Sequence, residues 1–255
     1  MPPSRIRRIL RIVRRVWITA GILFFVVFTT WALLAYRASA RAYDALETDQ
    51  RVTITDHETH WSFLPGSQDP NRAGLVFFPG AAVDPAAYAV LCRRVAEAGY
   101  PVVLVKVPRR GMFGGAEGPV PFARARAGMR ELSTRGWVVA GHSRGARIAA
   151  EMLLHDPSGI AGLILIGSSH PRDFSIAHVT GPVTRIYGTR DTVADVEKLE
   201  ATRRNLPASA RWVRVDGGNH SQFGHYGFQP GDWPATISRE DQQAQTLAAV
   251  LDALR

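Results

Sequence analysis

The chain has 255 residues, of which 46% are hydrophobic and 21% charged, and its formal net charge is +9. Eight arginines and no acidic residue lie in residues 1–41, so the remaining chain is almost neutral, with 23 basic and 22 acidic residues. The positive charge therefore belongs to the N-terminus and gives no support for nucleic-acid binding. The single cysteine, Cys92, excludes an internal disulfide and a zinc site built on thiolates.

Residues 16–36 are apolar and uncharged, which predicts a transmembrane helix. As a helix they would span about 31 Å, the thickness of a bilayer core. Aromatic side chains lie towards its ends, as membrane anchors do: Trp17, Trp31 and Tyr36. Six arginines precede the segment and two follow it closely, so residues 1–15 are predicted as a basic cytoplasmic tail. The expected location is the cell membrane, with a single pass, the N-terminus in the cytoplasm and the following domain outside it.

The alternative for this segment is a cleaved signal peptide, because residues 38–40 resemble a cleavage site. The apolar stretch is longer than the usual signal core, which favours an uncleaved signal anchor. Residues 37–50 are predicted as a linker. Residues 51–255 have the length of one domain with a single core.

Strand and helix patterns alternate through this domain, which predicts an α/β fold whose mostly parallel sheet has helices on both faces. Strands are expected near 51–55, 60–64, 74–78, 101–107, 136–140, 160–166, 182–187 and 211–215. Helices are expected near 85–98, 120–134, 145–155, 192–204 and 239–253. Only 16 residues separate the sixth strand from the seventh, which is too few for a cap domain. We therefore expect an open cleft, with the glycine-rich segment 108–120 as its mobile wall.

The segment 137–146 predicts a strand that delivers a serine onto a sharp turn before a helix. Gly141 and Gly145 flank Ser143 at the two positions where a Cβ would collide in such an elbow. The serine then lies at a helix N-terminus, where backbone N–H groups favour negative charge. Ser143 is therefore the predicted nucleophile.

A base and an orienting acid follow in the chain order that this elbow uses. Asp191 ends a short apolar strand, and His220 follows a Gly-Gly-Asn turn after the next strand. Both lie on loops past strand ends, where α/β active sites gather. His220 is the predicted base, with His225 as the alternative, and Asp191 the predicted acid, with Asp195 as the alternative.

The backbone N–H groups of Ala81 and Arg144 are the predicted oxyanion donors, because Ala81 follows an apolar strand and Gly80, and Arg144 follows the nucleophile. His142 is interpreted as a packing residue. His57 and His60 form an H-x-x-H pair, which in a strand-like segment is not expected to converge on a metal. Lys106 and Arg109 are either anion-binding residues or ordinary surface charges. No metal or cofactor is expected.

The chain resembles serine hydrolases of the α/β-hydrolase superfamily, and more narrowly the group catalogued as α/β-hydrolase family 5, small bacterial proteins that often carry an N-terminal membrane segment. The resemblance runs from about residue 60 to the C-terminus. It rests on the segments 78–81, 105–108, 141–145, 187–191, 218–224 and 226–240. Many relatives have leucine at the position of Arg144, whose expected contribution is its backbone N–H. The resemblance implies hydrolase chemistry without naming a substrate.

These observations predict a membrane-anchored carboxylic-ester hydrolase that acts through an acyl-enzyme on a small-molecule or lipid ester. An acyltransferase would use the same residues with another acceptor. A non-catalytic binding module on the same scaffold is the alternative from a different class. The oligomeric state stays open.

Overall fold

The computed structural model describes residues 5–255. One eight-stranded sheet has the order β1-β2-β4-β3-β5-β6-β7-β8. The strands are β1 (Val52–Asp56), β2 (His60–Pro65), β3 (Gly74–Phe78), β4 (Val102–Val105), β5 (Trp137–His142), β6 (Ile160–Ile166), β7 (Val183–Gly188) and β8 (Arg211–Val215). Strand β2 pairs antiparallel with β1 and β4, and every other pairing is parallel. All eight strands lie where the sequence predicts them.

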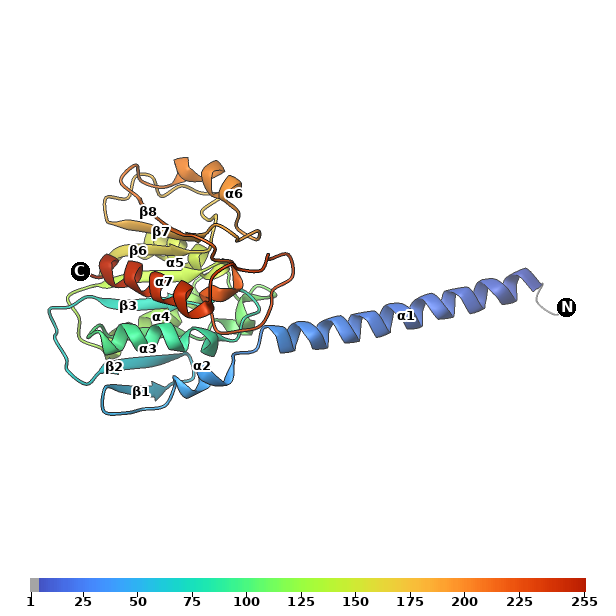
Figure 1. Cartoon of the computed structure of the whole chain (residues 1–255), viewed down its shortest axis with the longest axis horizontal. Coiled ribbons are helices and arrows are strands. Elements are labelled where there is room, and N and C mark those ends of the chain that lie inside the picture. Colours follow the sequence, from blue (N-terminus) through green and yellow to red (C-terminus); the bar gives the residue numbers. More distant parts are fainter. Residues whose placement is uncertain (1–4) are drawn as a thin grey trace.

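Helices cover both faces of the sheet (Figure 1). They are α1 (Arg5–Ala35), α2 (Ala40–Asp44), α3 (Ala89–Glu97), α4 (Val120–Glu131), α5 (Arg144–His155), α6 (Val196–Ala201) and α7 (Arg239–Ala253). Short 3-10 helices lie at Pro85–Tyr88, Pro108–Gly111, Arg203–Asn205 and Ser221–Phe223. Residues 167–182, between β6 and β7, contain no helix or strand, in agreement with the absence of a cap domain.

Strand β3 shows how the alternation of its side chains creates the two cores. Leu75 and Phe77 pack into one apolar cluster with α3 and α7, and Val76 and Phe78 into a second cluster with α4 and α5. A strand buried on both faces reads as a continuous apolar run. The central strands consequently hold their carboxyl ends, and the loops that follow, at one edge of the sheet.

The helix expected at 192–204 begins only at Val196. Asp195 caps it by accepting the N–H of Lys198 at 2.9 Å. The preceding turn is instead held by Asp191, whose Oδ1 accepts the N–H groups of Val193 and Ala194. The bonds that orient this carboxylate therefore exclude helix from residues 191–194.

Helix α1 extends away from the domain (Figure 1), and its segment Arg7–Ala32 is long and apolar enough to cross a membrane, with a mean hydropathy of 1.8 and none of it buried. The first four residues of the predicted basic tail lie outside the described residues. The segment predicted as a linker contains α2. Ala38, Ala42 and Ala45 are buried in the domain core.

Candidate active site

Ser143 occupies a strained turn between β5 and α5. Its φ of 54° and ψ of −117° lie in a region that non-glycine residues rarely adopt. A Cβ at position 141 would lie 2.2 Å from the carbonyl carbon of Gly145, and one at position 145 would lie 2.0 Å from the carbonyl oxygen of Phe78. The two glycines therefore allow the backbone contacts that hold Ser143 at the carboxyl edge.

Asp191 and His220 form a buried pair at the same edge. His220 Nδ1 lies 2.8 Å from Asp191 Oδ2, and both side chains are almost completely excluded from solvent. Asp191 Oδ1 is occupied by two backbone N–H groups, so the carboxylate is held in one orientation. The structure thus brings together two residues that lie 29 positions apart in sequence.

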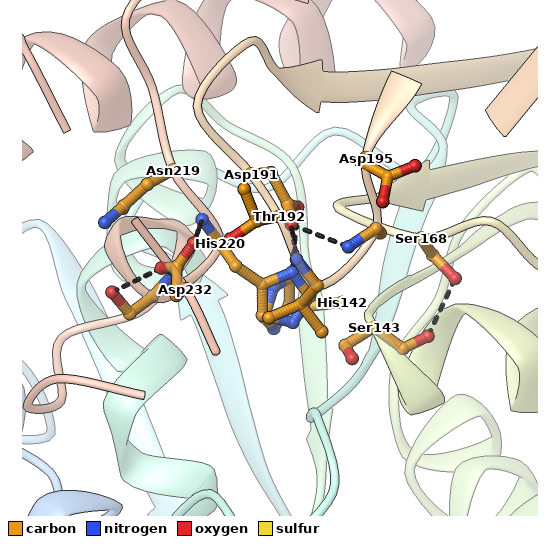
Figure 2. A network of polar contacts seen from close by, with 12 residues as sticks. His142, Ser143, Ser168, Asp191, Thr192, Asp195, Asn219, His220 and Asp232 are labelled. Atoms are coloured by element: carbon orange, nitrogen blue, oxygen red, sulfur yellow. Dashed lines mark hydrogen bonds and ion pairs between the residues drawn. The ribbon is translucent and has the colours of Figure 1, made fainter. Parts of the chain in front are cut away.

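The other ring nitrogen of His220, Nε2, is buried and has no hydrogen-bond partner within residues 5–255. In Figure 2 the Ser143 hydroxyl lies on the side of its residue that faces the imidazole rings of His142 and His220. The rings of His142 and His220 contact each other, with centroids 4.4 Å apart. No hydrogen bond joins the Ser143 hydroxyl to His220 Nε2. Such bonds between a nucleophile and its base are often long in ligand-free enzymes and tighten when substrate binds. Buried, unpartnered ring nitrogens also occur on His142, His170 and His225, so that of His220 is distinguished by its pairing with Asp191 on the other nitrogen.

Asp232 holds the backbone of the His220 loop, and sequence reasoning missed this role. Its Oδ1 accepts the N–H of His220 at 3.1 Å, and its Oδ2 accepts the N–H and the hydroxyl of Ser221 at 2.8 and 3.0 Å. Burial and the nearby carboxylate of Asp191 raise the pKa of Asp232. The only sequence signal is the Pro-Gly-Asp turn, in which Gly231 has a φ of 82°.

The ring of His142 packs against the ring of His220. The Tyr88 hydroxyl accepts the N–H of Gly80 at 3.1 Å and lies 2.8 Å from His142 Nδ1, so its own proton is directed to that nitrogen. Burial lowers the pKa of His142 well below its usual value. A neutral ring therefore packs against the His220 imidazole, in contact with it rather than only at the elbow.

The two predicted oxyanion donors lie on segments that touch. Arg144 is the first residue of α5, and Ala81 lies in the loop after β3. Gly145 packs against the carbonyl groups of Phe78 and Pro79, which brings the start of α5 to the start of that loop. A cavity of about 200 Å³ opens beside Ser143 and Arg144. Its wall also contains the segment 167–170, Arg172, Val193 and Ala194.

Of the alternatives considered for the acid and base, only Asp195 has a side-chain partner, since Nε2 of His225 is buried without one within the described residues. Asp195 caps α6 and pairs with Lys198 at 2.7 Å. His225 is buried, and burial lowers its pKa to about 4. Its backbone N–H donates to the carbonyl of Ala87, and its carbonyl accepts the N–H of Ser39. Neither residue contacts the Asp191–His220 pair through a described hydrogen bond.

His57 and His60 converge, which corrects the expectation drawn from a strand-like segment. Their rings stack with centroids 4.4 Å apart, and their Nε2 atoms lie 3.0 and 3.2 Å from the same carboxylate oxygen of Glu131. The expectation was wrong because His57 lies in the turn between β1 and β2, where side chains do not alternate between faces. These three residues could hold a metal ion.

The two cations near the cleft also have protein partners. Lys106 forms an ion pair with Asp56 and lies 4.2 Å above the Trp61 ring. The guanidinium of Arg109 donates to the carbonyl of Phe113 at 2.8 Å. Lys106 is therefore engaged at the side of the sheet, whereas Arg109 helps to fold the loop after β4.

The model of an alpha/beta hydrolase family matches residues 74–244, which is most of the domain and includes Ser143, Asp191 and His220. The chain belongs to the α/β-hydrolase family. No curated protein sequence matches it significantly.

Solved structures share the fold of this hydrolase. Dienelactone hydrolase from Anabaena variabilis has 14% identity and a TM-score of 0.59, over 80% of this chain and 100% of its own. TT1662 from Thermus thermophilus has 16% identity and a TM-score of 0.56, over 80% and 99%. A membrane phospholipase A, described as a bacterial virulence factor, has 15% identity and a TM-score of 0.56, over 96% and 99%.

Proposed function

We propose that this α/β hydrolase is a serine carboxylic-ester hydrolase in which Ser143, His220 and Asp191 act as a triad. The observation that carries the proposal is the buried Asp191–His220 pair, whose free Nε2 lies in the same site as a serine on a strained elbow. The elbow and the pair come from three separate loops that meet at one edge of the sheet, which supports the proposal.

In the proposed reaction, His220 Nε2 accepts the Ser143 proton as Oγ attacks the ester carbonyl. Asp191 accepts a hydrogen bond from Nδ1–H, which fixes the ring tautomer and stabilises the imidazolium. The N–H groups of Ala81 and Arg144 stabilise the oxyanion. His220 then protonates the leaving alcohol, and water hydrolyses the acyl-enzyme with the same imidazole as base.

We further propose that residues 16–36 remain as an uncleaved anchor. Ala38 is buried and the N–H of Ser39 donates to the carbonyl of His225, so the candidate cleavage site is attached to the domain, although Ser39 and Ala40 are themselves exposed. Removal of the segment up to residue 40 would strip these contacts from the core. The arginines before the anchor favour a cytoplasmic N-terminus and an extracytoplasmic domain.

The Ser143→Ala variant tests the triad in the full-length protein. Turnover of p-nitrophenyl butyrate should fall by about 10⁴–10⁶, because the three residues act as a unit. A fluorophosphonate probe should label the wild type at Ser143 and leave the variant unlabelled. The matched control is Ser158→Ala, which alters an exposed serine at the opposite edge of the sheet. Normal turnover in Ser143→Ala would refute the assignment.

A further inference from the structure

The end of α1 is attached directly to the catalytic domain. The carbonyl of Ala35 accepts the N–H of Gly227 at 2.8 Å, and the carbonyl of Tyr36 accepts the N–H of Asp84 at 2.9 Å. The Tyr36 ring stacks on Tyr226 with centroids 6.0 Å apart. A Cβ at position 227 would lie 2.8 Å from the Ala35 oxygen, so glycine is needed for this approach. No flexible spacer separates the apolar helix from the domain.

Both attachment segments belong to the candidate active site. Asp84 lies on the loop after β3 that carries Ala81, and Gly227 lies on the tail 224–235 that carries Asp232. Figure 1 shows α1 leaving the domain beside this tail, at the end of the domain where α7 begins. The helix therefore emerges from the carboxyl edge of the sheet.

Exposed aromatic side chains lie on the same edge. Phe113 is 82% exposed, and Phe228 and Trp233 are 54% and 56% exposed. Phe113 belongs to the loop 108–119, which contacts the Ala81 loop through the bond from Ala82 N–H to Arg110 O. Outside α1, the other exposed large apolar side chains in residues 36–255 are Tyr43, Val120 and Val196. None of these lies on a loop at the amino edge of the sheet.

Arginines accompany these aromatic side chains. Arg190 lies 5.0 Å above the ring of Trp233, Arg109 is on the loop of Phe113, and Arg37 directly follows α1. Aromatic and basic residues together are typical of surfaces at a membrane–water interface, where rings sit among headgroups and cations meet anionic lipids.

We propose that the catalytic edge faces the bilayer and that the substrate is an acyl ester of a membrane lipid, taken from the leaflet next to the domain. This inference rests on the proposed function. Water is the co-substrate: the acyl C–O bond breaks, hydroxide joins the acyl carbon, and the proton joins the alcohol oxygen. The wall of the small cavity beside Ser143 combines polar and apolar residues and includes Arg172 and Arg144, whose guanidinium pairs with Glu117. These cations suit a headgroup, while the acyl chain remains in lipid.

Site-directed labelling tests the orientation. The native Cys92 is completely buried, so a cysteine introduced by Phe113→Cys, Phe228→Cys or Ser158→Cys can be labelled selectively with an environment-sensitive fluorophore. The full-length variants are placed in vesicles of phosphatidylethanolamine and phosphatidylglycerol that contain brominated lipid. Labels at 113 and 228 should be quenched about twofold or more, because they lie in the interface, whereas the label at 158 should not. Equal quenching at all three sites, or none, would overturn the orientation.

A spacer variant tests the substrate class. Twenty Gly/Ser residues inserted between Leu34 and Ala35 leave residues 16–34 as the anchor and keep the contacts of Ala35 and Tyr36 with the domain, so the domain is released from the bilayer. Hydrolysis of vesicle phospholipid should fall about tenfold or more as the effective concentration drops, with p-nitrophenyl butyrate turnover retained. If wild type hydrolyses the soluble ester through Ser143 but not the phospholipid, the lipid inference fails and the proposed function stands. If Ser143→Ala keeps soluble-ester turnover, the proposed function fails.

Discussion

Two regions of this hydrolase pair imidazoles with a carboxylate, and they differ in what the remaining ring nitrogens do. One region is the hairpin cluster of His57, His60 and Glu131, in which Glu131 lies within hydrogen-bond distance of the Nε2 atoms of both histidines. His60 Nδ1 also lies 2.9 Å from the hydroxyl of Thr59. At the catalytic edge, Asp191 binds one nitrogen of His220 and leaves Nε2 buried without a partner. A histidine–carboxylate contact is therefore not a sign of catalysis by itself. The unsatisfied nitrogen beside a strained serine is what separates the two regions.

Among the changes that compare these two regions, the largest expected effect is at Asp191. Asp191→Asn should lower kcat for ester hydrolysis by about 10⁴, because an amide no longer stabilises the imidazolium or holds the required tautomer. Steady-state kinetics on p-nitrophenyl butyrate measure this. Retention of most of the activity would remove the distinction between this pair and the hairpin cluster.

The catalytic edge also holds buried imidazoles whose ionisation opposes folding. Burial lowers the pKa of His170 and of His225 to about 4, and lowers that of His142 well below its ordinary value. The unfolded chain therefore takes up protons first as the pH falls below about 6.5. Above that pH these imidazoles should not change the free energy of unfolding. Between about pH 6.5 and 4 they should lower it progressively.

Urea denaturation of the full-length protein at pH 7.5, 6 and 5 measures this loss. Each imidazole should contribute a slope of about 1.4 kcal/mol per pH unit where only the unfolded form is protonated. His170→Asn should flatten the dependence, and His178→Asn, at an exposed position, should leave it unchanged. A midpoint that rises towards pH 5 would contradict the sign of these shifts.

A smaller effect is expected at Asp232, which positions the His220 loop. Asp232→Asn places an NH₂ group where carboxylate oxygens now receive three hydrogen bonds. Hydrogen bonds to a charged group contribute about 1.5–3 kcal/mol, so kcat should fall about tenfold or somewhat more. KM should stay nearly constant, because the loop positions the base rather than the substrate. A change in KM alone would argue against this role.

The smallest effect is expected in the hairpin cluster. Glu131→Gln should leave ester turnover unchanged and should lower stability by about 1 kcal/mol, as a partly exposed acceptor for two imidazoles is weakened. Thermal denaturation should show a decrease in Tm of about 2–4 °C. A loss of activity comparable to that of Asp191→Asn would mean that the cluster takes part in the reaction.

The sequence by itself determined the α/β pattern, the glycines around Ser143 and the apolar N-terminal segment, because each depends on neighbours a few residues away. It also predicted Asp191 and His220, since both follow strands and the carboxyl ends of parallel strands share one edge. Only the tertiary structure revealed Asp232 below His220, Tyr88 on His142, Glu131 between His57 and His60, and the end of α1 on the Ala81 loop. These contacts join residues 11 to 74 positions apart, and no local periodicity encodes them. They form when packing brings unsatisfied polar groups together.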